Sequence, residues 1–387
     1  DQLQQTEKQT KVEQQEKKYE QKAEPNNNQK IKERNRTSNF ISHLVQQKSQ
    51  TYKEIREKYQ KDRHQHILLH QSLIDIGLKF NNNLIMGSNK RCIYLMEALK
   101  KLICDFRTNE PDFSFVKELS ISIDKIINFI QNFRAISEGM NTAFQYIKQL
   151  IGYLYNSQVS IETQQQWLCQ QINYFIKQKI YNAQELIIQI GLQFINNGDY
   201  ILIYAHSQVV ESLLIQAHKK GKQFTVIVVD NPPFNEGKQL FNNLTKQGIQ
   251  CIYTLLSNVP YFIKKTSKIF VGASSMLKNG SLVSRVGTAL LSCVSKEHRI
   301  PFHVFCESYK FSEKSQLDSL SQNELNVQRQ TTNINIIEIN LRYDLTPCQN
   351  INMVVTEIGP VPPTSVHTII REFTSNDYVG KIELPKE

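Results

Sequence analysis

The sequence predicts an α/β protein in which an N-terminal all-α helical domain precedes a doubly wound, mostly parallel, Rossmann-like sheet domain. Two patterns support this fold class. Up to about residue 195, apolar residues recur every three or four positions, the spacing of a buried helix face. From residue 196 onward, short continuous apolar runs alternate with amphipathic stretches, which is typical of a parallel sheet covered by helices on both faces. We therefore expect a polar head over 1–37, a helical domain over 38–195 and a sheet domain over 196–387.

The head is dominated by Gln, Lys, Glu and Asn and contains almost no aliphatic side chains. Such a segment buries too little apolar surface to offset the loss of chain entropy, so we expect it to be disordered and basic. Residues 1–66 hold 15 Lys and Arg against 10 Asp and Glu, about half of the formal net charge of +10. The remaining excess is spread thinly and no RNA- or DNA-binding motif occurs, so we expect no specific nucleic-acid partner.

The composition argues against several other classes of protein. No run of 18 or more apolar residues occurs and the N-terminus has no apolar signal segment, so we expect a cytosolic protein with no membrane partner. Seven cysteines without a CxxC motif favour reduced thiols, packed as small apolar side chains, over disulfides or a zinc site. His64, His66 and His70 lie close in the sequence but lack further ligand residues, so we expect no metal.

The helical domain is predicted from its apolar stripes. The segment from Asn39 places Phe40, Ile41, Leu44 and Val45 on one helix face. Glycine and proline are scarce before residue 195 and fall between the predicted helices, which marks the joints. The further helices are expected at about 66–80, 89–106, 112–132, 137–154 and 159–193.

The sheet domain begins where the apolar period changes, at Gly198 and Asp199. Continuous apolar runs rich in β-branched residues predict buried strands, and the amphipathic stretches after the first two runs predict helices at 206–220 and 236–247. The strands are expected at 200–204, 224–230, 249–256, 268–273, 302–308 and 351–357.

In such a sheet, ligands bind at the carboxyl ends of the strands, where the strand order reverses. No GxGxxG and no GxxxxGK[ST] motif occurs, so we expect no dinucleotide, nucleotide or other cofactor. His206, Asp230 and Glu307 could form an acid/base set, although helix-capping or loop contacts are the favoured explanation of each of them. The candidate ligand pocket comprises His206, Ser207, Asp230, Ser274, Gly280 and Glu307.

Several dispersed motifs resemble one known protein family. They are VGASSMLKNGSLVSRVGTALL (271–291), YDLTPCQNINMVVTEIGPVP (343–362) and VVDNPPFNEG (228–237). Together they resemble the family that joins methylthioribose-phosphate and ribose-bisphosphate isomerases to the alpha, beta and delta subunits of translation initiation factor 2B. The similarity extends over about residues 66–375. Three further segments resemble the delta subunits in particular: 87–99, 104–108 and 309–319.

The resemblance implies a scaffold that has lost the isomerase reaction. The isomerases of the family use a cysteine after the first strand and an aspartate after the fourth as an acid/base pair. Here His206 and Ser207 follow the first strand, and Ser274 stands at the aspartate position. A hydroxyl does not replace a carboxylate as a base at neutral pH without an activating partner. Pro232 stands where the enzymes have a phosphate-binding arginine, so we expect a non-catalytic protein.

The resemblance also implies partners. Family members assemble with the alpha, beta, gamma and epsilon subunits of initiation factor 2B, and the complex exchanges guanine nucleotide on initiation factor 2. The regulatory subunits sense phosphorylation of the alpha chain of factor 2, and a basic residue is the expected complement of a phosphoserine. The positions suggested as partner-binding are Ile74 and Ile76, at the beta–delta contact of the family, and Lys90, Arg91 and Arg134.

Two alternatives remain open at the level of sequence. The first is an active sugar-phosphate isomerase of the same fold, in which His206 and Asp230 act as the acid/base pair. The second is an RNA-binding protein that uses the basic head, although no stacking-aromatic motif supports it. The expectation that we follow is a non-catalytic regulatory or scaffold subunit.

Overall fold

The computed structural model describes residues 45–46, 70–107, 115–155, 159–325 and 339–376. The predicted disordered head and most of the helix predicted from Asn39 lie outside these residues, and Val45–Gln46 forms a two-residue strand, β1. The described residues fall into two units, the short segment Leu320–Gln322 belonging to the first and the others to the second. All features below belong to the second unit.

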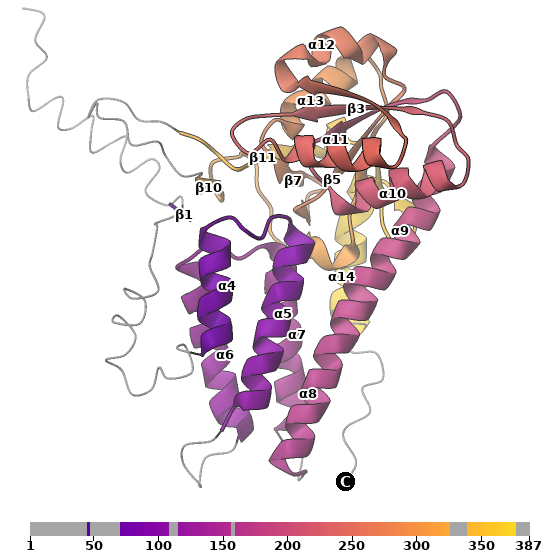
Figure 1. The fold of residues 1–387 in the computed structure, drawn as a ribbon. Coiled ribbons are helices and arrows are strands. Elements are labelled where there is room, and N and C mark those ends of the chain that lie inside the picture. Colours follow the sequence, from indigo (N-terminus) through magenta and orange to yellow (C-terminus); the bar gives the residue numbers. More distant parts are fainter. Residues whose placement is uncertain (1–44, 47–69, 108–114, 156–158, 326–338, 377–387) are drawn as a thin grey trace, which may run out of the picture. The chain divides into compact units, whose positions relative to one another are not determined.

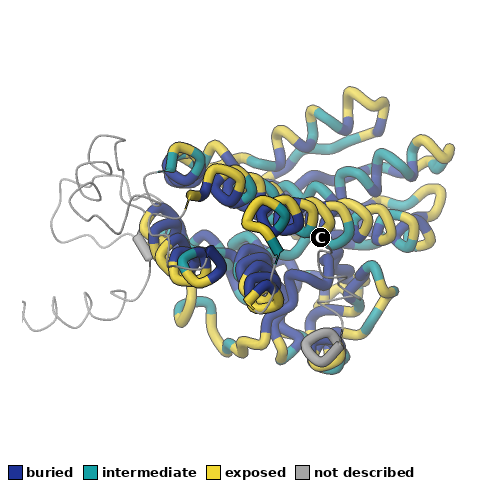
Figure 2. Tube along the Cα trace, turned by 90° about the horizontal axis from the view of Figure 1, so that it is seen from below, coloured by how far each residue is buried: buried dark blue, intermediate teal, exposed yellow. Residues whose placement is uncertain are grey.

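The first part of this unit is helical (Figure 1). The helices are α4 (Gln71–Asn81), α5 (Ser88–Asp105), α6 (Phe115–Gln131), α7 (Glu138–Leu154), α8 (Ile161–Phe175) and α9 (Ala183–Gly191), with a π-helical turn, η2 (Ile176–Asn182), between the last two. The apolar stripes of α4 to α8 meet in one buried core, as the spacing predicts, whereas α9 packs against the sheet described below. Figure 2 shows the result, with buried residues on the sides of the helices that face one another and exposed residues outside.

The second part is built on a seven-stranded sheet. Its strands are β2 (Tyr200–Tyr204), β3 (Thr225–Asp230), β4 (Gln250–Leu255), β5 (Lys268–Gly272), β8 (Phe302–Phe305), β12 (Met353–Val355) and β13 (Pro360–Val361). The order is β13-β12-β8-β5-β2-β3-β4, and every pair is parallel except β12 with β13. All six predicted strands are present. The chain runs outward from β2 through β3 and β4 and then returns to β5, so the strand order reverses between β2 and β5.

Helices cover both faces of this sheet. Side chains of α9, α10 (Gln208–Lys219) and α11 (Glu236–Lys246) share one core with the strands, whereas α12 (Val259–Phe262), α13 (Thr288–Glu297) and α14 (Val366–Asn376) share the other. In β2, Leu202 faces one core while Ile201 and Ile203 face the other. Short 3₁₀ turns connect the elements: η3 (Leu192–Phe194), η4 (Leu256–Asn258), η5 (Ile263–Lys265), η6 (Ser308–Lys310), η7 (Cys348–Asn350) and η8 (Pro363–Ser365).

The predicted fold class is confirmed, and the division between domains at residue 195 stays a prediction.

A small second sheet was not predicted. It has the order β11-β7-β6-β9, with β6 (Ser275–Leu277), β7 (Leu282–Arg285), β9 (Phe311–Ser312) and β11 (Tyr343–Thr346). A further two-residue strand, β10 (Glu324–Leu325), pairs with β1. Strands of two to four residues are too short to show a period of two in the sequence, and their pairing joins segments that are distant along the chain.

None of the helices in the described parts of the chain is both long and apolar enough to cross a membrane.

Candidate functional site

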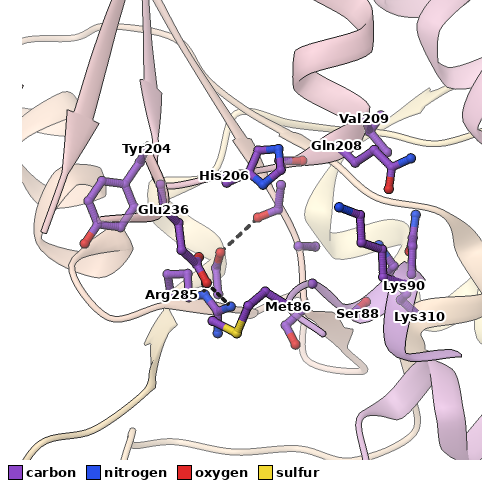
Figure 3. Close-up of a pocket in the computed structure, with 18 of the residues that line it drawn as sticks. Met86, Ser88, Lys90, Tyr204, His206, Gln208, Val209, Glu236, Arg285 and Lys310 are labelled. Atoms are coloured by element: carbon purple, nitrogen blue, oxygen red, sulfur yellow. Dashed lines mark hydrogen bonds and ion pairs between the residues drawn. The ribbon is translucent and has the colours of Figure 1, made fainter. Parts of the chain in front are cut away.

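A cavity lies at the carboxyl ends of β2 and β5, where the strand order reverses (Figure 3). Its volume is about 90 Å³, which is room for a few water molecules or a small ligand group. The lining comes from seven places: the N-terminus of α5, the turn from β2 into α10, the start of α11, the turn after β5, the end of β7, η6 and the start of β11. The helical segment and the sheet therefore both contribute to this cavity.

The turn from β2 into α10 presents His206 and Ser207 to the cavity. Ala205 has a φ of +54°, a left-handed conformation that costs a non-glycine residue about 1–2 kcal/mol, and it turns the chain sharply at the strand end. His206 Nε2 lies 2.7 Å from Oε2 of Glu211, one turn into α10, and Asn243 donates to Oε1 of the same carboxylate at 2.8 Å. Burial raises the pKa of Glu211, but the hydrogen bonds from His206 and Asn243 outweigh it, so the pKa lies below its ordinary value. His206 is therefore held by an ionised carboxylate.

The turn after β5 places Gly272, Ala273 and Ser274 in the same cavity. Gly272 approaches Ser207 so closely that an added Cβ would lie 2.3 Å from Ser207 Oγ. The backbone nitrogen of Ser274 donates to the carbonyl of Val283 at 3.0 Å. The predicted candidates His206, Ser207 and Ser274 thus line one site, which combines an imidazole and two hydroxyl groups.

Arg285 and Glu236 form a bidentate ion pair on the other side of the cavity, with Nε–Oε2 2.9 Å and Nη2–Oε1 2.7 Å. The Arg285 guanidinium also lies 5.3 Å from the centroid of the Tyr343 ring. Burial lowers the pKa of Arg285, but Tyr343 and the Glu236 carboxylate outweigh it, so the guanidinium stays charged. Lys90 of α5 and Lys310 of η6 face these residues across the cavity (Figure 3). The lining is rich in cationic side chains, and its one carboxylate, from Glu236, is paired with Arg285.

Asp230 lies apart from His206. It lines a neighbouring cavity of about 40 Å³, together with Pro232, Arg285 and Arg342. Its side chain is 1% exposed, and Oδ2 accepts hydrogen bonds from the Lys238 backbone nitrogen and the Tyr253 hydroxyl, both at 3.0 Å. Asp230 therefore holds the N-terminus of α11. The structure does not bring it together with His206 as the isomerase alternative requires.

Glu307 is fully buried behind the cavity and does not line it. Its Oε1 accepts from Asn89 Nδ2 at 2.6 Å and its Oε2 lies 2.6 Å from Lys310 Nζ. Gly280, the last predicted pocket residue, lies in the turn between β6 and β7 and also does not line the cavity. Its φ of +76° and the carbonyl of Pro363, 2.5 Å from an added Cβ, explain why glycine stands there.

Four of the five positions suggested as partner-binding are buried in this chain. Ile74 and Ile76 are 1% and 3% exposed and belong to the core of the helical segment. Arg91 and Arg134 are each 1% exposed. Only Lys90 is exposed, and it lies at the mouth of the strand-end cavity. These four side chains therefore do not face solvent in this chain, and the partner-binding role of the five positions stays a prediction.

The two arginines surround Glu324 in a buried ion cluster. Arg134 Nε lies 3.0 Å from the Glu324 carboxylate, and Arg91 and Arg342 each lie 3.7 Å from it. Burial and the neighbouring Arg134 lower the pKa of Arg91 to about 10. Burial also raises the pKa of Glu324, but the three arginines outweigh it, and the pKa lies below its ordinary value.

Sequence reasoning missed Arg285, Glu236, Tyr343 and Lys310 as lining residues. Arg285 and Tyr343 stand inside the motifs 271–291 and 343–362, so the motifs contained a signal for them. Glu236 and Lys310 likewise stand inside the segments 228–237 and 309–319 that carry the resemblance, but their place in the cavity depends on how distant segments pack. Within the described ranges, no group of three or more His, Cys, Asp or Glu side chains is arranged to hold a metal ion.

The chain is similar in sequence to translation factors and to isomerases. Residues 84–363 match the sequence model of the initiation factor 2 subunit family. The chain is 36% identical over 369 residues to the delta subunit of translation initiation factor eIF2B from Dictyostelium discoideum, covering 89% of this chain and 58% of that protein. It is also 36% identical over 324 residues to the delta subunit from Schizosaccharomyces pombe, covering 79% of this chain and 69% of that protein.

The similarity extends to an enzyme and to a solved complex. The ribose 1,5-bisphosphate isomerase of Pyrococcus furiosus is 28% identical over 313 residues, covering 78% of this chain and 94% of the enzyme. The crystal structure of the tetrameric eIF2B-beta2-delta2 complex from C. thermophilum superposes with a TM-score of 0.72 at 25% identity, covering 82% of this chain and 97% of the matched chain. The chain thus spans just over half of its Dictyostelium relative and most of the isomerase.

Proposed function

Because the chain belongs to the initiation factor 2 subunit family, we propose that it is a non-catalytic subunit of the guanine nucleotide exchange factor that acts on translation initiation factor 2. The curated relatives at 36% identity are delta subunits of eIF2B. We place this protein in the same position, as a regulatory or scaffold subunit in the cytosol, with the alpha, beta, gamma and epsilon subunits as its companions.

The non-catalytic part of this proposal rests on the four carboxylates around the strand ends, each of which already has a partner within the chain. Glu211 is paired with His206, and Glu236 with Arg285. Asp230 holds the N-terminus of α11, and Glu307 is buried against Asn89 and Lys310. An isomerase needs an acid/base pair that faces its substrate and exchanges protons. Each of these four carboxylates is instead engaged in holding the fold.

The strand-end cavity supports a vestigial ligand pocket. His206, Ser207 and Ser274 line it together with the cationic groups of Lys90, Arg285 and Lys310. Hydroxyl and cationic groups suit the binding of a small anion. Such a ligand would stabilise the fold by mass action without being converted.

The proposed partners follow from the relatives. The solved complex that resembles this chain contains beta and delta subunits. We propose that the sheet domain supplies the main pairing face and that the helical domain contributes to the surface that senses the phosphorylated alpha chain of factor 2. Among the suggested basic positions, exposed Lys90 remains a candidate for that contact.

The test is affinity purification of the tagged full chain from its own cells, with mass spectrometry of the proteins that accompany it. We expect four companions that resemble the other eIF2B subunits, together with factor 2, and release of GDP from factor 2 by the purified assembly. Recovery of the chain alone, without companions, would contradict the subunit proposal.

An assay of the same protein on ribose 1,5-bisphosphate separates the alternative. We expect no isomerisation above the rate without protein. Turnover that a His206→Ala variant abolishes would instead identify an active isomerase.

A further inference from the structure

Helices α5 and α8 pack in antiparallel register (Figure 1). Lys100 Nζ donates to Asn173 Oδ1 at 2.9 Å, and Gln165 Nε2 donates to the Phe106 carbonyl at 2.9 Å. Lys100 near the end of α5 contacts Asn173 near the end of α8, whereas Phe106, just past α5, contacts Gln165 near the start of α8. The contacts therefore form a row along two antiparallel helices. Cys104 and Cys169 lie between these two contacts.

The two cysteines face each other directly. Their sulfur atoms are 3.0 Å apart, and the residues are 65 positions apart in the sequence. A disulfide bond is about 2.05 Å long, so bond formation requires the sulfurs to approach by about 1 Å. The polar contacts on either side hold the two helices in the register that makes this approach short.

The environments of the two thiols differ in a way that gives each a role. Cys104 is exposed, whereas Cys169 is 8% exposed. Burial and the hydrogen bond with Cys104 raise the pKa of Cys169 to about 12. Because the thiolate is the reactive form, oxidation starts at the exposed thiol, and the buried thiol reacts second. By comparison, Cys92 and Cys306 are fully buried, so solvent does not reach them.

We propose that Cys104 and Cys169 form a reversible oxidation site, which a peroxide converts from two thiols into a disulfide that joins α5 to α8.

The reaction balances in two steps. The Cys104 thiol releases its proton, and the thiolate attacks one oxygen of hydrogen peroxide and breaks the O–O bond, which gives a sulfenic acid on Cys104. The other oxygen leaves as hydroxide, which takes up the released proton and becomes water. The Cys169 sulfur then attacks the Cys104 sulfur, and the sulfenic oxygen leaves as water with the thiol proton. Overall, two thiols and one peroxide give one disulfide and two water molecules. A small dithiol or glutathione reverses the change by thiol–disulfide exchange.

The consequence for the fold is a covalent link within the helical core. Both helices contribute to the buried core of the helical segment, and neither cysteine lines the strand-end cavity. A crosslink between residues this far apart in the sequence restricts the unfolded chain, so the oxidised form resists unfolding. We expect its midpoint of thermal unfolding to rise by about 5 °C.

The experiment uses the full chain, purified from its own cells with the proteins that accompany it. Samples are treated with hydrogen peroxide or with dithiothreitol, free thiols are blocked by alkylation, and the digested peptides are analysed by mass spectrometry. Cys104→Ser and Cys169→Ser remove the pair. Cys293→Ser is the matched control, because Cys293 is also an exposed thiol but lies on α13.

We expect a crosslinked peptide pair containing Cys104 and Cys169 in the wild type and in Cys293→Ser, and its loss after dithiothreitol. In Cys169→Ser, peroxide should drive Cys104 to sulfinic acid, because no resolving thiol remains. The rise in the unfolding midpoint should be absent from both pair variants. Two results would overturn the proposal: Cys104 oxidised in the folded wild type while Cys169 stays a free thiol, or a crosslink from Cys104 to a different cysteine.

Discussion

Gly272 lies where the ends of β2 and β5 come together, and it shows how single residues shape the cavity. A Cβ at this position would lie 2.3 Å from Oγ and 2.6 Å from Cβ of Ser207. By contrast, a Cβ on Gly152, in helix α7, would meet no atom within 4 Å. The two glycines therefore have opposite reasons to be present. One is required by a neighbour, and the other only weakens its helix.

We expect Gly272→Ala to lower the free energy of unfolding by about 1–3 kcal/mol, because Ser207 and the strand end must shift. Gly152→Ala should raise it by about 0.5–1 kcal/mol, because alanine restricts the unfolded chain and favours the helix. Urea denaturation measures both. The double variant Gly272→Ala with Ser207→Gly should recover most of the loss. Equal effects of the two alanine substitutions would show that the strand ends do not meet as described.

Glu324 is the second residue whose role depends on its neighbours. It is 8% exposed and lies among Arg91, Arg134 and Arg342. Removal of the carboxylate leaves buried guanidinium groups without a counter-charge, which is costly because the interior screens charge poorly.

Glu324→Gln should therefore lower the free energy of unfolding by about 3–5 kcal/mol at neutral pH. The pKa of Glu324 lies below its ordinary value in the folded state, so its contribution is complete above about pH 4.3, the value for an unfolded glutamate. The contribution is lost as the pH falls through the folded pKa. The difference between wild type and variant should shrink correspondingly in urea titrations at acidic pH. Glu313→Gln, at an exposed position, is the control and should change stability by less than about 0.5 kcal/mol.

At the scale of elements, the start of α13 shows how the small sheet holds a helix that covers the large one. Gly287 precedes the helix with a φ of +108°, and an added Cβ would lie 2.2 Å from the Tyr204 hydroxyl. Asp344 on β11 accepts hydrogen bonds from the backbone nitrogens of Gly287 and Ala289, at 2.7 and 2.8 Å. The first turn of α13 is therefore capped by a residue 55 positions away in the sequence.

Asp344→Ala should cost about 1–3 kcal/mol of unfolding free energy, because two backbone donors lose their acceptor in a buried position. Asp344→Asn retains one acceptor oxygen and should cost less. The matched control is Asp75→Ala, since Asp75 is exposed on α4 and accepts a hydrogen bond from the nearby Gln71 side chain. Thermal and urea unfolding would reveal the ranking. Indistinguishable values for the three variants would contradict the cap.

At the scale of the whole folded unit, a buried network joins the helical segment to the sheet. Asn89 at the start of α5 donates to Glu307 at 2.6 Å and accepts from the Tyr309 hydroxyl at 2.7 Å. Lys310 neutralises the same glutamate at 2.6 Å. The residues after β8 thus bind the first turn of a helix that lies more than 200 positions earlier. This contact holds the N-terminus of α5 in place, where its residues line the strand-end cavity.

Asn89→Ala should lower the free energy of unfolding by about 2–3 kcal/mol, because it leaves buried polar groups of Glu307 and Tyr309 without a partner. Asn173→Ala removes an exposed asparagine contact from α8 and should change stability by less than about 0.5 kcal/mol. Tyr309→Phe combined with Asn89→Ala tests whether the two residues act together. A coupling of about 1 kcal/mol or more is expected, and strict additivity would argue against a shared network.

The sequence by itself determined six of the seven strands of the large sheet. Continuous apolar runs and helical stripes are local properties, because a buried strand or helix face must be apolar wherever it packs. All six predicted strands and the order of helices before them follow from that. The sequence also predicted His206, Ser207 and Ser274 as pocket residues at the strand ends, and the structure brings these three to one cavity.

Only the tertiary structure decided which charged and polar residues are buried and what they bind. The sequence suggested surface positions for Arg91 and Arg134 in the helical domain, yet both lie against Glu324, which follows 233 and 190 positions later. Asp230 is the last residue of β3, and its carboxylate accepts a hydrogen bond from the Lys238 backbone in the first turn of α11. The energy of an ion pair or hydrogen bond depends on a partner from elsewhere in the chain, so it is settled when the chain folds and not by local sequence.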